Sequence, residues 1–230
     1  MLIPFLIYRC YLNGLNSIII YIVSLISSLL TSVLYNYIIS KKNKINIYYR
    51  ELIYSIIITF ILPINTPYLL LFFVNIVVIL LSKYIDMVNI YLIPTTLVYF
   101  VILLMNNTLH FLNYNIYFFS LMLIMSLFTL IDTRSTKFRI SLFYILMIII
   151  KLLISQTILP IDYLLLFSGV FVIPEFKSTP NTAFIQIIFA VLIGIISIIC
   201  SIEYFFVLVL ILNIIFKHID KYYSYFLAKQ

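Results

Sequence analysis

Residues 168–194 read SGVFVIPEFKSTPNTAFIQIIFAVLIG. An apolar run stops at Pro174, a charged and hydroxyl-rich segment follows, and a membrane-length apolar run begins after Pro180. Proline ends a helix because it has no N–H and its ring clashes with the preceding turn. Backbone interrupted in this way has to lie in water or against protein, because lipid satisfies none of its polar groups. The stretch therefore predicts a broken transmembrane helix.

The composition of the whole chain excludes a soluble domain. Of 230 residues, 65% are hydrophobic and 9% are charged, and the mean hydropathy is +1.24. A soluble domain carries about a quarter of charged residues, whereas repeated apolar runs of roughly 20 residues indicate membrane-spanning helices. The predicted fold class is all-α, a polytopic helical membrane bundle that forms a single transmembrane domain over residues 1–230.

The charge and cysteine content argue against several classes of site. The net charge of +7 comes without a dense basic patch, so it indicates the positive-inside bias of membrane proteins rather than nucleic-acid binding. Cys10 and Cys200 lie far apart and form no CxxC motif. No metal site is therefore predicted. The chain also has no P-loop, no GxGxxG and no Ser/His/Asp set, so soluble hydrolase or nucleotide chemistry has no support.

Nine crossings are predicted from Leu15 onward, after a half-length apolar piece over residues 1–13 that Pro4 and Arg9 break. The positive run from Lys41 to Arg50 is placed in the cytoplasm, which predicts the N-terminus outside, the C-terminus inside and a prokaryotic inner membrane as location. The crossings cover residues 15–40, 52–62, 67–83, 90–105 (broken near its start by Pro94), 114–131, 140–159, 161–173, 181–200 and 204–216.

Two segments of the chain share one layout. Residues 51–85 and 162–196 each begin with an acidic residue and a half-length apolar arm, stop at a proline, and resume as a long apolar helix after a second proline. In the predicted topology the first segment starts inside and the second starts outside. This is the pattern of an inverted repeat, in which broken helices meet near the midplane and line a site. Two unrelated proline-broken helices are the alternative.

Lys151 lies in the middle of an apolar run, in YILMIIIKLLISQTILP. A charge at that depth costs about 2.5 to 3.5 kcal/mol on insertion scales, so such a side chain usually faces a cavity or a partner. Asp162 and Glu175 are the candidate partners, and the three residues are candidates for a buried charge or an ion pathway. Snorkelling of the lysine to the interface is the alternative.

The segment Lys177, Ser178 and Thr179 is a candidate for binding an anion or the phosphate of a cofactor. Its hydroxyl groups, its lysine and the helix N-terminus expected at Asn181 all suit a negative charge. An ordinary cytoplasmic loop with a Thr or Asn cap is the alternative.

At these broken helices the sequence resembles the D subunit of the Rnf ion-translocating electron-transport complexes and its counterpart, the B subunit of sodium-pumping NADH:quinone oxidoreductase. The resemblance extends from about Pro4 to Lys221. Three stretches carry it: residues 168–194, residues 51–85 (ELIYSIIITFILPINTPYLLLFFVNIVVILLSKYI), and residues 90–98 (IYLIPTTLV), which lie where the family has an F-N-P-A turn.

The resemblance implies a subunit of a membrane oxidoreductase, rather than a stand-alone enzyme, that works with other membrane and redox subunits. Family members hold flavins and pass electrons while sodium ions or protons cross. This chain has no S-G-A-T motif for covalent attachment, so the expected cofactor is FMN bound without a covalent bond, with Thr95 and Thr96 as further candidate residues. The alternative function is a small secondary transporter or channel subunit with no redox role.

Overall fold

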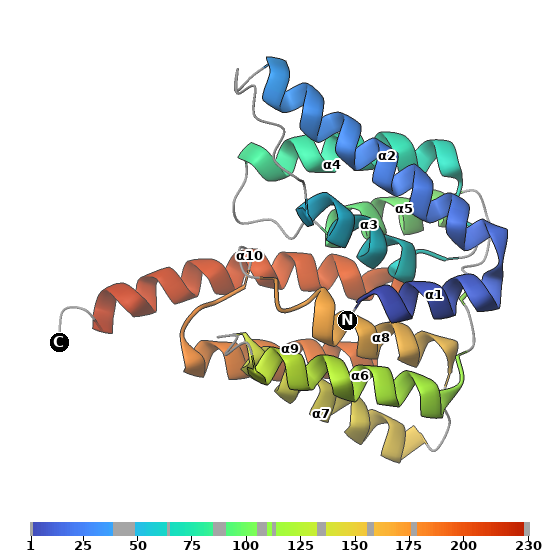
Figure 1. Cartoon of the computed structure of the whole chain (residues 1–230). Helices are drawn as coiled ribbons and strands as arrows, with labels where there is room; N and C mark the ends of the chain where they lie inside the picture. The colour runs from blue at the N-terminus through green and yellow to red at the C-terminus, as the bar shows by residue number, and fades with distance from the viewer. Residues whose placement is uncertain are drawn as a thin grey trace. The chain divides into compact units, whose positions relative to one another are not determined.

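In the computed structural model, the described residues are 2–38, 49–63, 65–84, 91–104, 110–111, 114–132, 137–155, 159–175 and 179–227. These residues form α-helices and contain no strand (Figure 1), as the all-helical class requires. The helices are α1 (Leu2–Asn13), α2 (Leu15–Ile38), α3 (Tyr49–Ile61), α4 (Tyr68–Tyr84), α5 (Leu92–Leu104), α6 (Ile116–Asp132), α7 (Phe138–Ser155), α8 (Pro160–Phe171), α9 (Ala183–Ile199) and α10 (Ile202–Leu227).

Two of the described helices are long and apolar enough to cross a membrane: Leu15–Tyr35 within α2, and α7. Six shorter apolar segments, in α3, α4, α5, α6, α8 and α9, are 10–17 residues long. A hydrocarbon core of about 30 Å takes about 20 helical residues, so the shorter helices span it only in part or where the bilayer is thin. The helical membrane class agrees with these helices, and the number of nine crossings stays a prediction.

The chain forms two compact units. Unit 1 comprises Met1–Ile85 with Ile93–Leu112, and unit 2 comprises Asp86–Leu92 with Asn113–Gln230. In unit 1, α2 packs against both α3 and α4, and α1 packs against α3. In unit 2, α7 packs against both α8 and α9, and α6 packs against α8. The same order of helix packing thus occurs twice, and the segments 51–85 and 162–196 fall on α3–α4 and α8–α9. The inverted orientation of the two copies stays a prediction.

The prolines end helices where the sequence predicted, but the chain then reverses. In unit 2, α8 is antiparallel to α7, because Gly169 lies against Tyr144 while Asp162 lies against Lys151. Helix α9 is parallel to α7, because Gly194 lies against Met147 while Asn181 lies against Lys137. The segment around Pro174 therefore joins two arms of a helical hairpin that pack on α7, and does not interrupt one straight span.

Close helix packing in unit 2 depends on two glycines. A Cβ at Gly169 would lie 2.4 Å from the Tyr144 ring, and one at Gly194 would lie 2.4 Å from the Met147 Cβ. Both positions are on the arms that face α7. Small residues of this kind let membrane helices approach each other closely.

The two predicted helix breaks at Pro4–Arg9 and at Pro94 are wrong. Helix α1 runs unbroken through Pro4 and Arg9, and α5 runs unbroken through Pro94. Both prolines lie in the first turn of their helix, where the backbone N–H groups have no intrahelical partner in any case. Helix α10 contains the predicted crossing 204–216 and continues to Leu227, so the segment after Phe216 is helical as far as Leu227.

Unit 1 contains a buried polar network between α2, α3 and α4. The Tyr54 hydroxyl donates to Asn75 Oδ1 at 2.7 Å, and Asn75 Nδ2 donates to the hydroxyls of Ser24 at 3.3 Å and Ser27 at 3.1 Å. All four side chains are buried. The amide of Asn75 is thus satisfied at both its oxygen and its nitrogen, which fixes the three helices against one another.

Candidate functional site

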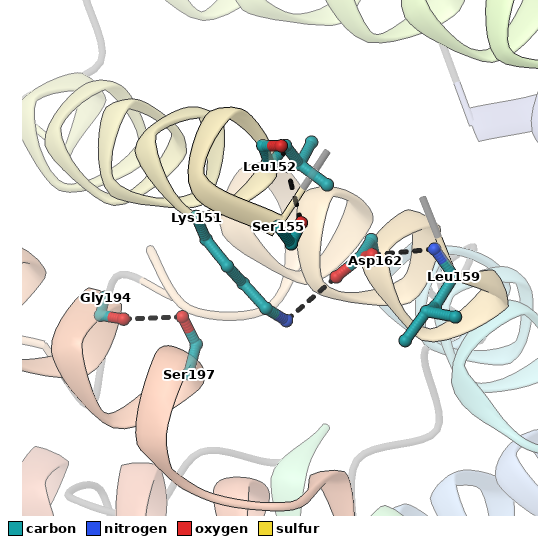
Figure 2. A network of polar contacts seen from close by, with 7 residues as sticks. All are labelled: Lys151, Leu152, Ser155, Leu159, Asp162, Gly194 and Ser197. Atoms are coloured by element: carbon teal, nitrogen blue, oxygen red, sulfur yellow. Dashed lines mark hydrogen bonds and ion pairs between the residues drawn. The ribbon is translucent and has the colours of Figure 1, made fainter. Parts of the chain in front are cut away.

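Lys151 of α7 and Asp162 of α8 form an ion pair within the apolar part of unit 2 (Figure 2). The distance from Lys151 Nζ to Asp162 Oδ1 is 2.9 Å. The Asp162 side chain is 3% exposed and the Lys151 side chain is 22% exposed. The structure thus brings together two of the residues that the sequence singled out as buried-charge candidates.

The second oxygen of Asp162 is bound by its own helix. Asp162 Oδ2 accepts a hydrogen bond from the Leu159 backbone N–H at 2.9 Å, and the carboxylate lies in the first turn of α8. The positive end of the helix dipole stabilises a negative charge at this place. Asp162 therefore has a charged partner on one oxygen and a backbone donor on the other, which is the arrangement that a buried carboxylate needs.

Glu175 lies beyond the other end of α8. Asp162 and Phe171 are about 14 Å apart along the helix axis at 1.5 Å per residue, and Glu175 follows Phe171. Its backbone oxygen accepts hydrogen bonds from the N–H and the hydroxyl of Thr179, at 3.2 and 2.6 Å. The structure thus places Glu175 with the linker before α9 rather than with Asp162.

The N-terminus of α9, which the sequence suggested for an anion, is bound by a carboxylate of the same chain. Asp220 of α10 accepts hydrogen bonds from the N–H of Asn181 at 2.8 Å, the N–H of Thr182 at 3.0 Å and the Thr182 hydroxyl at 2.6 Å. Lys177 and Ser178 lie outside the described residues.

Two lysines meet at the same linker. Lys137 Nζ donates to the Thr179 backbone oxygen at 3.0 Å, to the Pro180 oxygen, and to Asn181 Oδ1 at 2.8 Å. Lys217 Nζ donates to the same Thr179 oxygen at 3.3 Å. We call Lys137, Thr179, Asn181, Lys217 and Asp220 the linker cluster. It ties the start of α7 and the distal part of α10 to the entrance of α9.

The surroundings of Lys137 and Asp220 in the linker cluster shift the pKa of both side chains. Burial, and after it the nearby charge of Lys217, lower the pKa of Lys137, while Asp220 opposes the shift; the resulting pKa is about 8. For Asp220, burial opposes ionisation, but the hydrogen bonds from Thr182 and Asn181, together with Lys137, hold its pKa below the usual range. The cluster thus holds an ionised carboxylate beside a lysine whose pKa is lowered.

Sequence reasoning missed the roles of Lys137 and Asp220. For Asp220, the signal that could have revealed it is helical spacing: Asn213, Lys217 and Asp220 are four and then three residues apart, which places them on one face of a helix.

A buried arginine performs the corresponding task in unit 1. Arg9, 2% exposed, donates to the backbone oxygens of Phe60 and Leu62, the latter at 2.6 Å. The Tyr99 hydroxyl donates to the Ile61 oxygen at 2.9 Å. These are the carbonyls that the helix end before Pro63 leaves without intrahelical partners. No local sequence pattern indicates this contact, since Arg9 and α3 are far apart in the chain.

The cofactor candidates Thr95 and Thr96 lie on α5, in unit 1, whereas Thr179 lies in unit 2. Thr95 is fully buried, and the Thr96 hydroxyl donates to the Ile93 backbone oxygen at 2.8 Å. The Thr179 hydroxyl donates to Glu175, as above. The hydroxyls of Thr96 and Thr179 are therefore used within their own segments.

An apolar cavity of about 360 Å³ lies between α6 and α7. All its lining residues are aliphatic or phenyl: Ile124, Leu127 and Phe128 on α6, and Phe138, Leu142, Ile145, Leu146 and Ile149 on α7. A flavin phosphate placed there would have no hydrogen-bond donor. Within the described part of the chain, no group of three His, Cys, Asp or Glu side chains could hold a metal ion.

Residues 1–85 match the model of the family described as NQR2, RnfD, RnfE. No curated protein matches the chain significantly. The matched part contains α1 to α4, and hence Arg9, the Pro63 turn and the Asn75 network, while the ion pair and the linker cluster lie outside it. The family is associated with membrane subunits of ion-translocating Rnf and Nqr complexes. Residues 1–85 of this chain are thus similar to the NQR2, RnfD, RnfE family.

Proposed function

We propose that this chain is an integral membrane subunit of an Rnf/Nqr-like complex, in which flavin-linked electron transfer drives sodium ions or protons across the prokaryotic inner membrane. The family match of residues 1–85 is the observation that carries this proposal. The remaining subunits of such a complex, in the membrane and in the cytoplasm, are its partners.

The ion pair of unit 2 is the proposed ion-handling element. Charged residues within membrane helices usually mark ion or proton paths. A small cation or a proton can take the place of the Lys151 ammonium as the counter-charge of Asp162, and the Leu159 N–H keeps the carboxylate in position during the exchange. Asp162 is therefore assigned the role of transient ion ligand, and Lys151 the role of the charge that displaces the ion.

The flavin is proposed to be FMN without a covalent bond. The described donors of the segment before α9 do not fit its phosphate: Asp220 occupies the N–H groups of Asn181 and Thr182, and the Thr179 hydroxyl is bound to Glu175. Lys177 and Ser178 are the remaining candidates in that segment. Purified protein should show flavin absorption that acid precipitation releases into solution, and a colourless preparation from the intact complex would overturn this part of the proposal.

The ion-handling role is tested in membrane vesicles from a strain that lacks the chain. Supplying the chain should restore electron-transfer-driven uptake of sodium ions or protons, and Asp162→Asn should restore electron transfer without ion uptake. Lys221→Gln, at an exposed position of α10, is the matched control and should restore both. Vesicles that transport ions equally well without the chain would contradict the proposal.

A secondary transporter or channel subunit is the second candidate, because the buried Lys151–Asp162 pair suits solute pathways as well. The two candidates separate in proteoliposomes that contain this chain alone. Ion or solute flux there would favour the transporter, and its absence, together with flux by the whole complex, would favour the electron-transport subunit.

A further inference from the structure

The two copies of the repeated packing differ at one buried position. Asn75 and Gln186 are each the twelfth residue after the proline that follows the preceding helix, Pro63 or Pro174. In unit 1 both ends of the Asn75 amide have partners. In unit 2, Gln186 Nε2 donates to the backbone oxygens of Pro180 and Asn181, at 3.1 and 3.0 Å, but no described residue donates to its Oε1.

Three more side chains of unit 2 leave polar atoms without partners, as far as the described residues reach. They are Ser141 and Tyr144 on α7, at their hydroxyls, and Asn213 on α10, at both its amide nitrogen and its oxygen. Ser141, Gln186 and Asn213 are the ones nearest to the linker cluster. Ser141 and Gln186 are 0% exposed and Asn213 is 1% exposed. A buried polar group without a partner pays its full cost of dehydration, so native proteins supply such groups with water or another ligand.

Ser141, Gln186 and Asn213 lie next to the linker cluster, each on a different helix. Ser141 is one turn after Lys137 on α7, and Asn213 is one turn before Lys217 on α10; residues four apart share a helix face. Both lysines donate to the Thr179 oxygen, and Gln186 and Lys137 both donate to the Pro180 oxygen. The three side chains therefore lie at one level, a single helical turn deeper than the cluster.

We propose that Ser141, Gln186 and Asn213 line a water-filled pocket that opens to the aqueous phase through the linker cluster. We call it the hydrated pocket. Asn181, at the cluster, is exposed, which gives water its entry.

The chemistry of the lining selects water over an ion. A hydroxyl and two carboxamides offer donors and acceptors together, and a buried water makes two to four such bonds. Two ammonium groups one turn away repel a cation. The three lining side chains are neutral, so none of them supplies the full charge that a buried anion needs as a partner.

The hydrated pocket has a consequence for the ion pair. Lys137, Ser141, Tyr144 and Lys151 recur along α7 at intervals of four, three and seven residues, which places them on one face of that helix. The pocket thus brings water to one end of this helix face. The other end carries Lys151, the partner of Asp162. In this respect the pocket deepens the proposed function, but its existence is tested without any electron transfer.

The test is the reaction of single cysteines in the full chain with a small neutral thiosulfonate, 2-hydroxyethyl methanethiosulfonate. Only the thiolate reacts, and a thiol ionises in water far more readily than in an apolar core. In a background of Cys10→Ser and Cys200→Ser, we expect Ser141→Cys and Asn213→Cys to react at least about tenfold faster than the controls. The controls are Ile148→Cys and Val209→Cys, at fully buried apolar positions of the same helices, and Ser27→Cys, in the satisfied network of unit 1. Equal rates at all five positions would overturn the proposal.

A second variant keeps the test decisive if a cysteine perturbs the fold. Asn213→Leu removes both unpaired atoms. If the pocket is dry, the leucine should raise the melting temperature, because an unsatisfied amide is replaced by an apolar group. If the pocket is hydrated, the leucine displaces its water and leaves Ser141 and Gln186 unpaired, so the melting temperature should fall. A rise measured by circular dichroism would overturn the proposal.

Discussion

Asp162 is held at both carboxylate oxygens, and its two partners differ in kind. Lys151 supplies a full charge from α7, while the Leu159 N–H supplies a backbone donor from the start of α8. Removing one member of a buried pair leaves an uncompensated charge, whereas removing both charges together is often close to neutral. The pair is therefore best tested by a double-mutant cycle.

We expect Lys151→Met to destabilise the folded protein by about 1–3 kcal/mol, below the range for fully buried pairs because Lys151 is 22% exposed. The double variant Lys151→Met with Asp162→Asn should regain most of this loss, since no charge then remains buried. Chemical unfolding in detergent, followed by circular dichroism, measures both. A Lys151→Met protein as stable as the parent would show that the ion pair does not stabilise the folded protein.

Lys137 makes stability depend on pH. Its pKa in the folded protein is about 8, below the ordinary 10.5, with Lys217 and Asp220 as its charged neighbours. Between these two values the folded state binds fewer protons than the unfolded state, so the free energy of unfolding rises with pH. The rise should reach at most about 3 kcal/mol by pH 10.5.

Lys137→Met is the control for this rise of the free energy of unfolding with pH. The variant should lack the increase between pH 8 and 10.5, whatever its stability at pH 7. Asp220 affects stability at acidic pH. Its pKa in the folded protein is below the ordinary 3.8, so the ionised carboxylate stabilises the fold above pH 3.8. This stabilisation is lost as the pH falls through the pKa of the folded state. A parallel pH dependence of the parent and Lys137→Met would contradict the assignment.

At the scale of the element, both hairpins end a helix inside the protein and satisfy the exposed backbone differently. In unit 1 the carbonyls at the end of α3 accept from Arg9 and Tyr99. In unit 2 the N–H groups at the start of α9 donate to Asp220. A positive group thus caps a helix C-terminus and a negative group caps a helix N-terminus, as the helix dipole favours.

Arg9 and Tyr99 should contribute unequally to the α3 cap. Tyr99→Phe removes one neutral hydrogen bond and should cost about 1 kcal/mol, whereas Arg9→Met removes two charge-assisted bonds and should cost about 2–4 kcal/mol. Thermal unfolding in detergent gives the order of the two. Tyr68→Phe, whose hydroxyl is at an exposed contact with Asn16, is the control and should change little. If Arg9→Met behaved like this control, the cap would have no role in stability.

At the scale of the whole molecule, the same order of helix packing occurs in both units. The long helices α2 and α7 each hold a hairpin, α3–α4 or α8–α9. Each unit buries its own hairpin against its own central helix, and the Arg9 contacts, the ion pair and the linker cluster each lie within one unit. Functional differences between the units then arise from individual substitutions, such as Asn75 in one and Gln186 in the other.

The orientation in the membrane is a prediction for the whole chain. With the positive residues from Lys41 to Arg50 inside, the N-terminus lies outside and the C-terminus lies in the cytoplasm. A fluorescent protein fused after Gln230 should therefore fluoresce, and an epitope before Met1 should be reached by antibody on intact spheroplasts. A protected N-terminal epitope beside a fluorescent C-terminal fusion would show an even number of crossings.

Local chemistry allowed much of the fold to be predicted from the sequence. Pro63 and Pro174 end helices because of what a proline does to its own turn. Apolar runs predicted helices because a membrane leaves the backbone few alternatives. Lys151 was expected to have a partner because a lone charge in an apolar run is costly, and Asp162 was among the acidic residues near enough in sequence to be named.

Tertiary structure alone decided which distant groups meet. Arg9 binds Phe60 and Leu62, and Lys137 binds Thr179, across more than 40 residues of chain. Such contacts depend on how α2 and α7 place their neighbours, and no local pattern encodes that placement. The reversal of the chain after Pro174 is of the same kind, because a proline ends a helix without choosing the direction that follows. The sequence by itself therefore determined where helices end and which charges need partners, and the packing of each unit determined which partners they have.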